Sequence, residues 1–162
     1  MEARKFRQMN EALDWVFEAP KKEQVERMKA VAAGNQTFIP YVRWGLGADE
    51  VDWGLPEGMP DSTKIKDDIP DGMGETTLQL EFRRIQQFTD PNSNMNNLPA
   101  WKREMNWMSI IEGVHHKEAE LITHIKDKQL LKLYPKLEAI LEDLGITDYV
   151  KPKKTRKRAS KK

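Results

Sequence analysis

Two histidines and one carboxylate are spaced so that they could hold a metal ion. His116, Glu120 and His124 follow one another at intervals of four residues, and a helix would place all three on one face. Imidazole and carboxylate groups in such an arrangement bind transition metals. This face points away from the apolar positions Ala119 and Ile122, toward water, where a bound metal would lack the surrounding shell that catalysis needs.

The same residues can be explained by helix capping. His115 or His116 can cap the start of the helix, and Glu118 and Glu120 can complement the positive charge at that end. We favour this explanation and keep a metal-dependent enzyme using His116, Glu120 and His124 as an alternative.

A calcium site is a further candidate, formed by Asp61, Asp67, Asp68 and Asp71. Calcium loops place oxygen ligands at alternating positions around a central glycine. This sequence has neither feature, so we expect these carboxylates to be solvated.

Motifs of nucleophilic and phosphate chemistry are missing. The chain has no cysteine, and its serines do not lie in a G-x-S-x-G turn. It contains neither a G-x-x-x-x-G-K nor a G-x-G-x-x-G phosphate loop. Its paired carboxylates fall in a polar run, where no burial would raise their pKa values toward neutrality. We therefore expect a protein that is not an enzyme and that needs no cofactor.

Residues 105–125 have the helix, glycine turn and second helix of a helix-turn-helix. A helix that reads DNA offers side chains such as Arg, Asn or Gln to the bases. This second helix offers Glu118 and Glu120, which phosphates would repel. We favour a plain helical hairpin.

The last twelve residues form a strongly basic tail. Residues 151–162, called the basic tail below, contain eight cations and no acid. The eight are Lys151, Lys153, Lys154, Arg156, Lys157, Arg158, Lys161 and Lys162. Without an apolar anchor the segment cannot form a packed element, so we expect it to be disordered. Its charge predicts non-specific contact with DNA or RNA; a charge run without a dedicated partner is the alternative.

The net charge of +1 hides this division. The other 150 residues hold 19 basic and 26 acidic side chains, a net charge of −7. Most of that excess lies in residues 45–74, the acidic segment, which has eight acids and two lysines. The acidic segment is also rich in proline and glycine, so we expect an irregular loop.

Within this segment, residues 53–58 (WGLPEG) combine apolar side chains with turn formers. We expect Trp53 and Leu55 to pack into the core and the acids to face water. The alternative is a loop in which Trp53, Leu55, Pro56, Glu57 and Gly58 recognise a partner. No stretch of the chain is apolar for about 18 residues, and no secretory signal follows the start.

Apolar residues recur at helical spacing through most of the chain. Proline and glycine separate the periodic stretches, so we expect an all-α domain of six or seven short helices over residues 1–150. The faces of these helices are formed by Phe6–Val16, Val25–Ala32, Tyr41–Trp44, Leu78–Ile85, Leu98–Ile111, Ala119–Ile125 and Leu137–Leu144.

An ordered set of short motifs resembles a known family. The motifs are Leu55-Pro56-Glu57-Gly58 with Pro60, Glu81 with Arg83-Arg84, Arg103-Glu104, Ile111-Glu112 and Lys126-Asp127-Lys128. Together they resemble an uncharacterised family of small proteins from contractile-tailed phages, notably phages of marine cyanobacteria, over residues 38–140. Family members tend to have Asp-Pro where this chain has His115-His116, and the basic tail lies outside the pattern.

The resemblance implies a viral origin and no particular activity. We therefore expect a phage accessory protein in the cytoplasm of the infected bacterial host. Its body would bind a phage or host protein, and its tail would add nucleic-acid contact in replication, transcription or genome handling. A host-directed or virion-associated interaction protein, with an incidental tail, is the alternative.

Overall fold

The computed structural model describes residues 2–48, 51–60, 63, 69–70 and 73–146. Within these residues the chain forms seven α-helices and three short 3-10 helices. In chain order these are α1 (Met9–Glu18), α2 (Lys21–Gly34), α3 (Phe38–Leu46), α4 (Phe82–Thr89), η1 (Asn94–Asn97), α5 (Ala100–Gly113), α6 (His116–Lys126), α7 (Leu130–Leu133), η2 (Pro135–Ile140) and η3 (Glu142–Leu144). The all-α prediction is confirmed.

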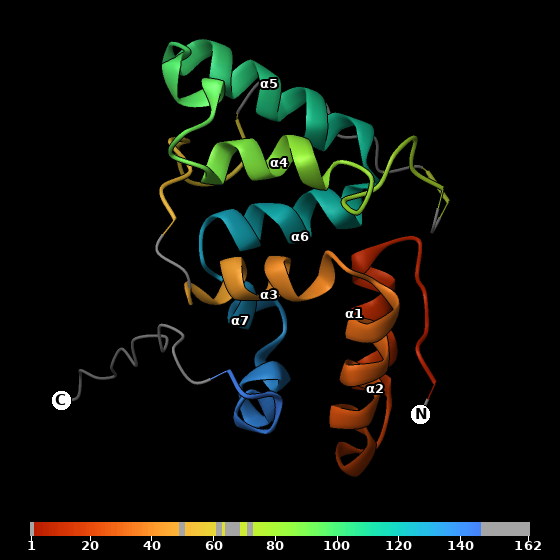
Figure 1. The fold of residues 1–162 in the computed structure, drawn as a ribbon. Helices are drawn as coiled ribbons and strands as arrows, with labels where there is room; N and C mark the ends of the chain where they lie inside the picture. Colours follow the sequence, from red (N-terminus) through yellow and green to blue (C-terminus); the bar gives the residue numbers. More distant parts are fainter. Residues whose placement is uncertain (1, 49–50, 61–62, 64–68, 71–72, 147–162) are drawn as a thin grey trace, which may run out of the picture.

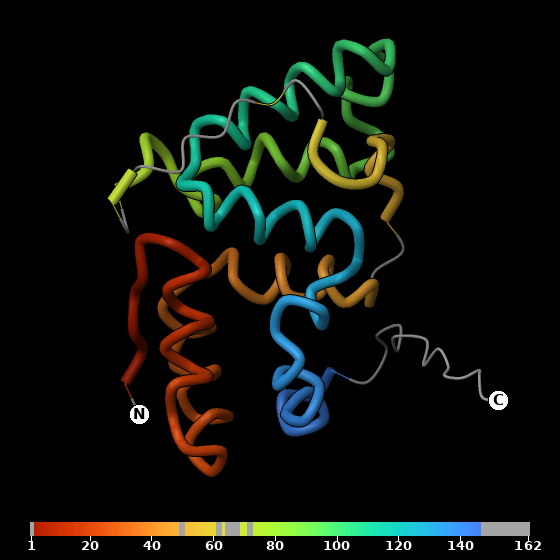
Figure 2. The backbone as a smooth tube through the Cα atoms, turned by 180° about the vertical axis from the view of Figure 1, so that it is seen from behind, coloured from red at the N-terminus to blue at the C-terminus, as the bar shows by residue number. Residues whose placement is uncertain are grey.

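The helices form a stack with a hairpin across one end. Figure 1 shows α5, α4, α6 and α3 lying one below another, with the α1–α2 hairpin beside one end of α6 and α3 and roughly at right angles to them. Helix α6 contacts α1, α3, α5 and α7 and is the central element. Figure 2 shows from behind that α7 and the last 3-10 helices lie beyond α3, away from α5. No helix among the described residues has the length and apolar character needed to cross a lipid bilayer.

The helix boundaries follow the glycines and prolines. Helices α2 and α5 end at Gly34 and Gly113, and Pro20 follows the end of α1. The chain leaves η3 through Gly145, whose left-handed backbone (φ 78°) suits glycine. These stops agree with the predicted ones.

Two predicted helices differ from the structure. The helix expected from Leu78 begins only at Phe82. Residues 78–81 form a turn before it, in which the N–H of Glu81 donates to the Thr77 carbonyl at 3.0 Å and that of Leu80 to the Thr77 hydroxyl at 3.2 Å. The last expected helix, over residues 137–144, is the pair of 3-10 helices η2 and η3. The short helix α7 was not predicted.

A buried carboxylate connects three segments that are distant in sequence. Glu118 on α6 has no exposed surface. Its Oε2 accepts the backbone N–H of Met9 at 2.9 Å, and its Oε1 accepts that of Leu78 at 3.2 Å. Met9 is the first residue of α1, where the positive end of the helix dipole favours an anion. Glu118 lies in the first turn of α6, as expected, and its carboxylate in addition accepts main-chain donors on two other segments.

Replacing Glu118 with glutamine tests this contact through its pH dependence. Burial raises the pKa of Glu118 from 4.5 to about 7, although the two backbone N–H groups act to lower it. Because the folded protein holds the proton more tightly, stability contributed by this group is greatest below the unfolded pKa and decreases as the pH rises to the folded one. The free energy of unfolding of the natural protein, minus that of Glu118→Gln, should fall by up to about 3 kcal/mol from about pH 4.5 to about pH 7.

Urea denaturation of both proteins across this range measures the difference. A difference that grows with pH would mean that the two N–H donors outweigh burial.

Candidate functional site

The site is built on the loop of residues 51–60, which follows α3 within the acidic segment and contains the WGLPEG motif. Trp53 anchors it and is only 5% exposed. Its ring packs edge-on against Trp44 of α3 at 5.5 Å and against Trp107 of α5 at 5.7 Å between ring centroids. Leu55 is half-buried against the same core. The prediction that Trp53 and Leu55 pack into the core is confirmed.

Two side chains bind the loop at Gly54, directly before its tip. The carboxylate of Asp52 accepts the N–H of Gly54 at 3.0 Å, which makes a tight turn. The guanidinium of Arg103 on α5 donates to the Gly54 carbonyl at 3.2 Å and to the Leu98 carbonyl at 2.8 Å. The loop is therefore tied to α5 directly after its tryptophan.

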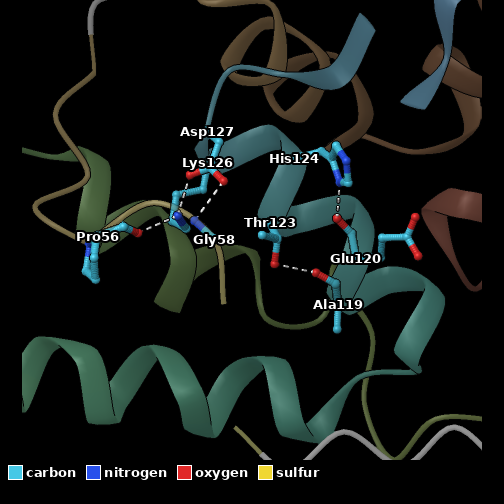
Figure 3. Close-up of polar contacts among 8 residues, drawn as sticks. All are labelled: Pro56, Gly58, Ala119, Glu120, Thr123, His124, Lys126 and Asp127. Carbon is cyan, nitrogen blue, oxygen red and sulfur yellow. Dashed lines mark hydrogen bonds and ion pairs between the residues drawn. The ribbon is translucent and has the colours of Figure 1, made fainter. Parts of the chain in front are cut away.

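A buried ion pair at the end of α6 binds the tip itself. Lys126 and Asp127 contact each other, with side chains 2% and 9% exposed. Figure 3 shows the Lys126 ammonium donating to the Pro56 carbonyl, at 2.8 Å, and the Asp127 carboxylate accepting the N–H of Gly58, at 3.0 Å. A buried ion pair becomes favourable only when further hydrogen bonds satisfy its charges. The loop backbone supplies those bonds, so pair and loop stabilise each other.

The tip that results is exposed but fixed. Pro56 and Glu57 are exposed, while the carbonyl of Pro56 and the N–H of Gly58 are both bound. Gly58 adopts a left-handed backbone (φ 77°), which lets the chain turn directly after Glu57. Lys126, Asp127 and Arg103 thus belong to the site. Neither composition nor helical periodicity indicates a role for these three residues. The only sequence feature that singles them out is that they belong to the short motifs that resemble those of the phage family.

The structure brings some of those motifs together and leaves others apart. Leu55–Gly58, Arg103 and Lys126–Asp127 meet around the loop. Glu81, directly before α4, forms a local ion pair with Arg84 in that helix, at 2.5 Å. Ile111 lies in the core, and Glu112 of the same motif is exposed.

The histidine face has the orientation expected of it and does not form a metal site. Glu120 is exposed, and His116 and His124 are half-exposed. Figure 3 shows that the His124 ring bonds the backbone carbonyl of Glu120, at 2.8 Å. Across the described part of the chain, no three His, Asp or Glu side chains lie together as metal ligands.

Helix α6 has the expected cap. His115 Nδ1 accepts the N–H of Lys117 at 3.1 Å, while Nε2 bonds the carbonyl of Ile69 at 3.1 Å. His115 itself is fully buried.

The remaining predicted site residues lie outside the described residues. These are the proposed calcium ligands Asp61, Asp67, Asp68 and Asp71 and the eight cations of the basic tail.

Trp53 should contribute strongly to stability, and an exposed tryptophan provides a matched control. Trp53→Ala should lower the free energy of unfolding by about 3 to 5 kcal/mol, because it leaves a large cavity between Trp44 and Trp107. Trp101 is 60% exposed, so Trp101→Ala should change stability by about 0.5 kcal/mol or less. Urea denaturation of both variants measures this; equal small losses would show that the loop does not depend on its tryptophan.

Comparison with known proteins gives one match. No curated protein and no solved structure matches the chain. A family model described as a family of unknown function, DUF6433, matches residues 19–132. This range includes the loop, Arg103 and the Lys126–Asp127 pair, and it excludes the basic tail. The chain is therefore a member of the DUF6433 family.

Proposed function

We propose that this is a phage-encoded, non-enzymatic accessory protein that binds a protein partner through the exposed tip of the 51–60 loop. The basic tail adds non-specific contact with DNA or RNA. The setting is replication, transcription or genome handling in the cytoplasm of the infected bacterial host. The observation that carries the proposal is the fixed tip, in which Pro56 and Glu57 are exposed between main-chain groups held by the buried Lys126–Asp127 pair.

A fixed tip suits recognition for an energetic reason. Binding orders the residues that make contact, and this ordering weakens association. The hydrogen bonds at Pro56 and Gly58 and the packing of Trp53 have already ordered this loop. The exposed acids Asp52 and Glu57 then complement a partner with a basic surface.

The use of the buried charged groups favours binding over catalysis. An active site leaves perturbed acids and bases available to a substrate. Here Lys126 and Asp127 are engaged with the loop backbone, and Glu118 is engaged with the backbone of Met9 and Leu78. Because these charged groups already bond the backbone, they are not available to bind or react with a substrate.

Charge reversal at the tip tests the proposal. Immobilised Glu57→Lys protein should recover the partner from infected-cell lysate at least about tenfold less well than the natural protein, because like charges would then face each other. Glu18→Lys is the matched control: Glu18 is the exposed last residue of α1, and Figure 1 shows α1 on the opposite side of the molecule from the segment of residues 51–60. Quantitative mass spectrometry of the bound proteins gives the ratio.

Nuclease treatment of the lysate separates direct binding from capture through nucleic acid. Retention of the partner after nuclease supports contact through the body. Equal recovery by Glu57→Lys and Glu18→Lys would place the contact away from the tip.

The basic tail should bind nucleic acid in a salt-dependent manner. If about five of its cations pair with phosphates, the slope of log K against log salt on duplex DNA should be roughly −4 to −5. A variant with all eight cations replaced by glutamine should not bind, because the remaining residues carry −7. Fluorescence anisotropy with random-sequence DNA measures both. Retained binding by the glutamine variant would assign nucleic-acid contact to the body.

A further inference from the structure

The residues that precede α1 form an extended strap along the α1–α2 hairpin. Residues 3–7, called the N-terminal strap below, have no helix or strand structure and run beside the hairpin in Figures 1 and 2. One bond joins the strap to another segment through backbone atoms alone, from the N–H of Arg4 to the carbonyl of Ala30 at 3.0 Å. The guanidinium of Arg7 in the strap donates to the Gly74 carbonyl at 2.8 Å.

Two side-chain amides bind the backbone of Arg4 and Phe6. Asn35, which is 4% exposed, donates from Nδ2 to the Arg4 carbonyl at 2.9 Å and accepts the Phe6 N–H on Oδ1 at 3.1 Å. Gln79 donates to the carbonyl of Phe6 and, at 3.0 Å, to Asn35 Oδ1. Asn35 is itself fixed by a bond to the Val31 carbonyl, at 2.8 Å. Because these side chains bond only main-chain groups, they can bind any extended peptide backbone, from this chain or from another one.

Close approach of the strap requires the glycine at the end of α2. A Cβ atom on Gly34 would lie 2.3 Å from the carbonyl oxygen of Arg4. The wall formed by Ala30, Gly34, Asn35 and Gln79, called the strap groove below, therefore fits a polypeptide backbone at van der Waals distance.

The ring of Trp15, beside the groove, makes the site selective for two side chains of the bound segment. The guanidinium of Arg4 lies 4.6 Å from the centre of the Trp15 ring, and the Phe6 ring lies 5.5 Å from it. A second cation, Arg27, also lies 4.6 Å from Trp15 and donates to its carbonyl at 2.8 Å. Trp15 is thus held ready to receive a cation and a ring two residues apart.

The groove is larger than the segment that fills it. An open cleft of about 410 Å³ continues past Lys5 and Phe6, toward Thr37 and Leu80. Another cleft, of about 380 Å³, adjoins Arg4 and Trp15. The groove wall lies within the range matched by the family model, whereas the strap lies before it.

From this geometry we infer that the strap groove is a binding site for an extended peptide segment with the pattern Arg-any residue-Phe. The N-terminal strap occupies the site within its own chain, and a partner protein carrying the pattern displaces it. The groove lies on the α1–α2 side, so this inference goes beyond the function proposed for the 51–60 loop and does not depend on it. A partner segment can make the same main-chain bonds, and its additional residues gain contact with the open clefts.

The full-length double variant Arg4→Ala, Phe6→Ala tests this inference. It weakens the strap's hold and leaves the groove wall unchanged. The probe is a fluorescent peptide with the sequence of residues 3–8, Ala-Arg-Lys-Phe-Arg-Gln, followed by anisotropy. The double variant should bind it saturably with one site. The natural protein should bind it at least about tenfold more weakly, because the tethered strap competes at high effective concentration.

Two controls identify the groove as the binding site. Adding Gly34→Ala to the double variant should abolish peptide binding while helix content by circular dichroism stays the same. A peptide with Ala-Ala-Lys-Ala-Arg-Gln should not bind the double variant. If the double variant is unfolded, Arg4→Ala alone is used, since Arg4 is exposed and its loss weakens only the strap.

Two results would overturn the inference. The first is absence of saturable binding to a variant that remains folded, which would make the strap a permanent part of the fold. The second is equal binding of the alanine peptide or of the Gly34→Ala protein, which would show charge attraction in place of groove recognition.

Discussion

The rest of the structure depends on the bond between one buried carboxylate and two distant backbone amides. Glu118 on α6 accepts the N–H of Met9, where α1 begins, and that of Leu78, where the chain returns from the acidic segment. The carbonyl of Leu78 in turn accepts the hydroxyl of buried Tyr41 on α3. Helices α1, α3 and α6 are therefore joined at one point, and an apolar residue at 118 would leave two buried donors unpaired.

Helix α6 organises the molecule at both ends for the same physical reason. At its start Glu118 binds main-chain donors; at its end Lys126 binds the Pro56 carbonyl and Asp127 binds the Gly58 N–H. Each charged group is buried with main-chain partners, which is the condition under which burial of charge is tolerated. Because α6 also packs against four other helices, the position of the loop tip is coupled to that of the whole core.

Helical periodicity was sufficient to predict the fold class and most helix positions, and the apolar side chains among the turn formers of residues 53–58 predicted the packing of Trp53. Neither pattern could predict the site, because the decisive bonds join side chains to the backbone of residues far away in sequence. Glu118 and Met9 are 109 residues apart, and Lys126 and Pro56 are 70 apart. The spacing of apolar residues does not say which charged side chains are buried, so it gave no sign that Glu118 and Lys126 bind distant main-chain groups.

The two surfaces differ in how their main-chain contacts are supplied, and this difference separates their roles. At the loop the holding groups are ionised, buried and coupled to the core, so release would expose an unpaired charge and is strongly opposed. At the strap, Asn35 and Gln79 supply neutral amides beside open clefts, and a hydrogen bond between neutral groups contributes only about 1 kcal/mol net. The charged contact from the Arg7 guanidinium to the Gly74 carbonyl comes from the strap and not from the groove. A second peptide that repeats the strap's bonds therefore exchanges with the strap at little cost. The fixed tip of the 51–60 loop suits a partner that binds in a single orientation. The exchangeable strap suits a partner that binds the groove by competing with the strap.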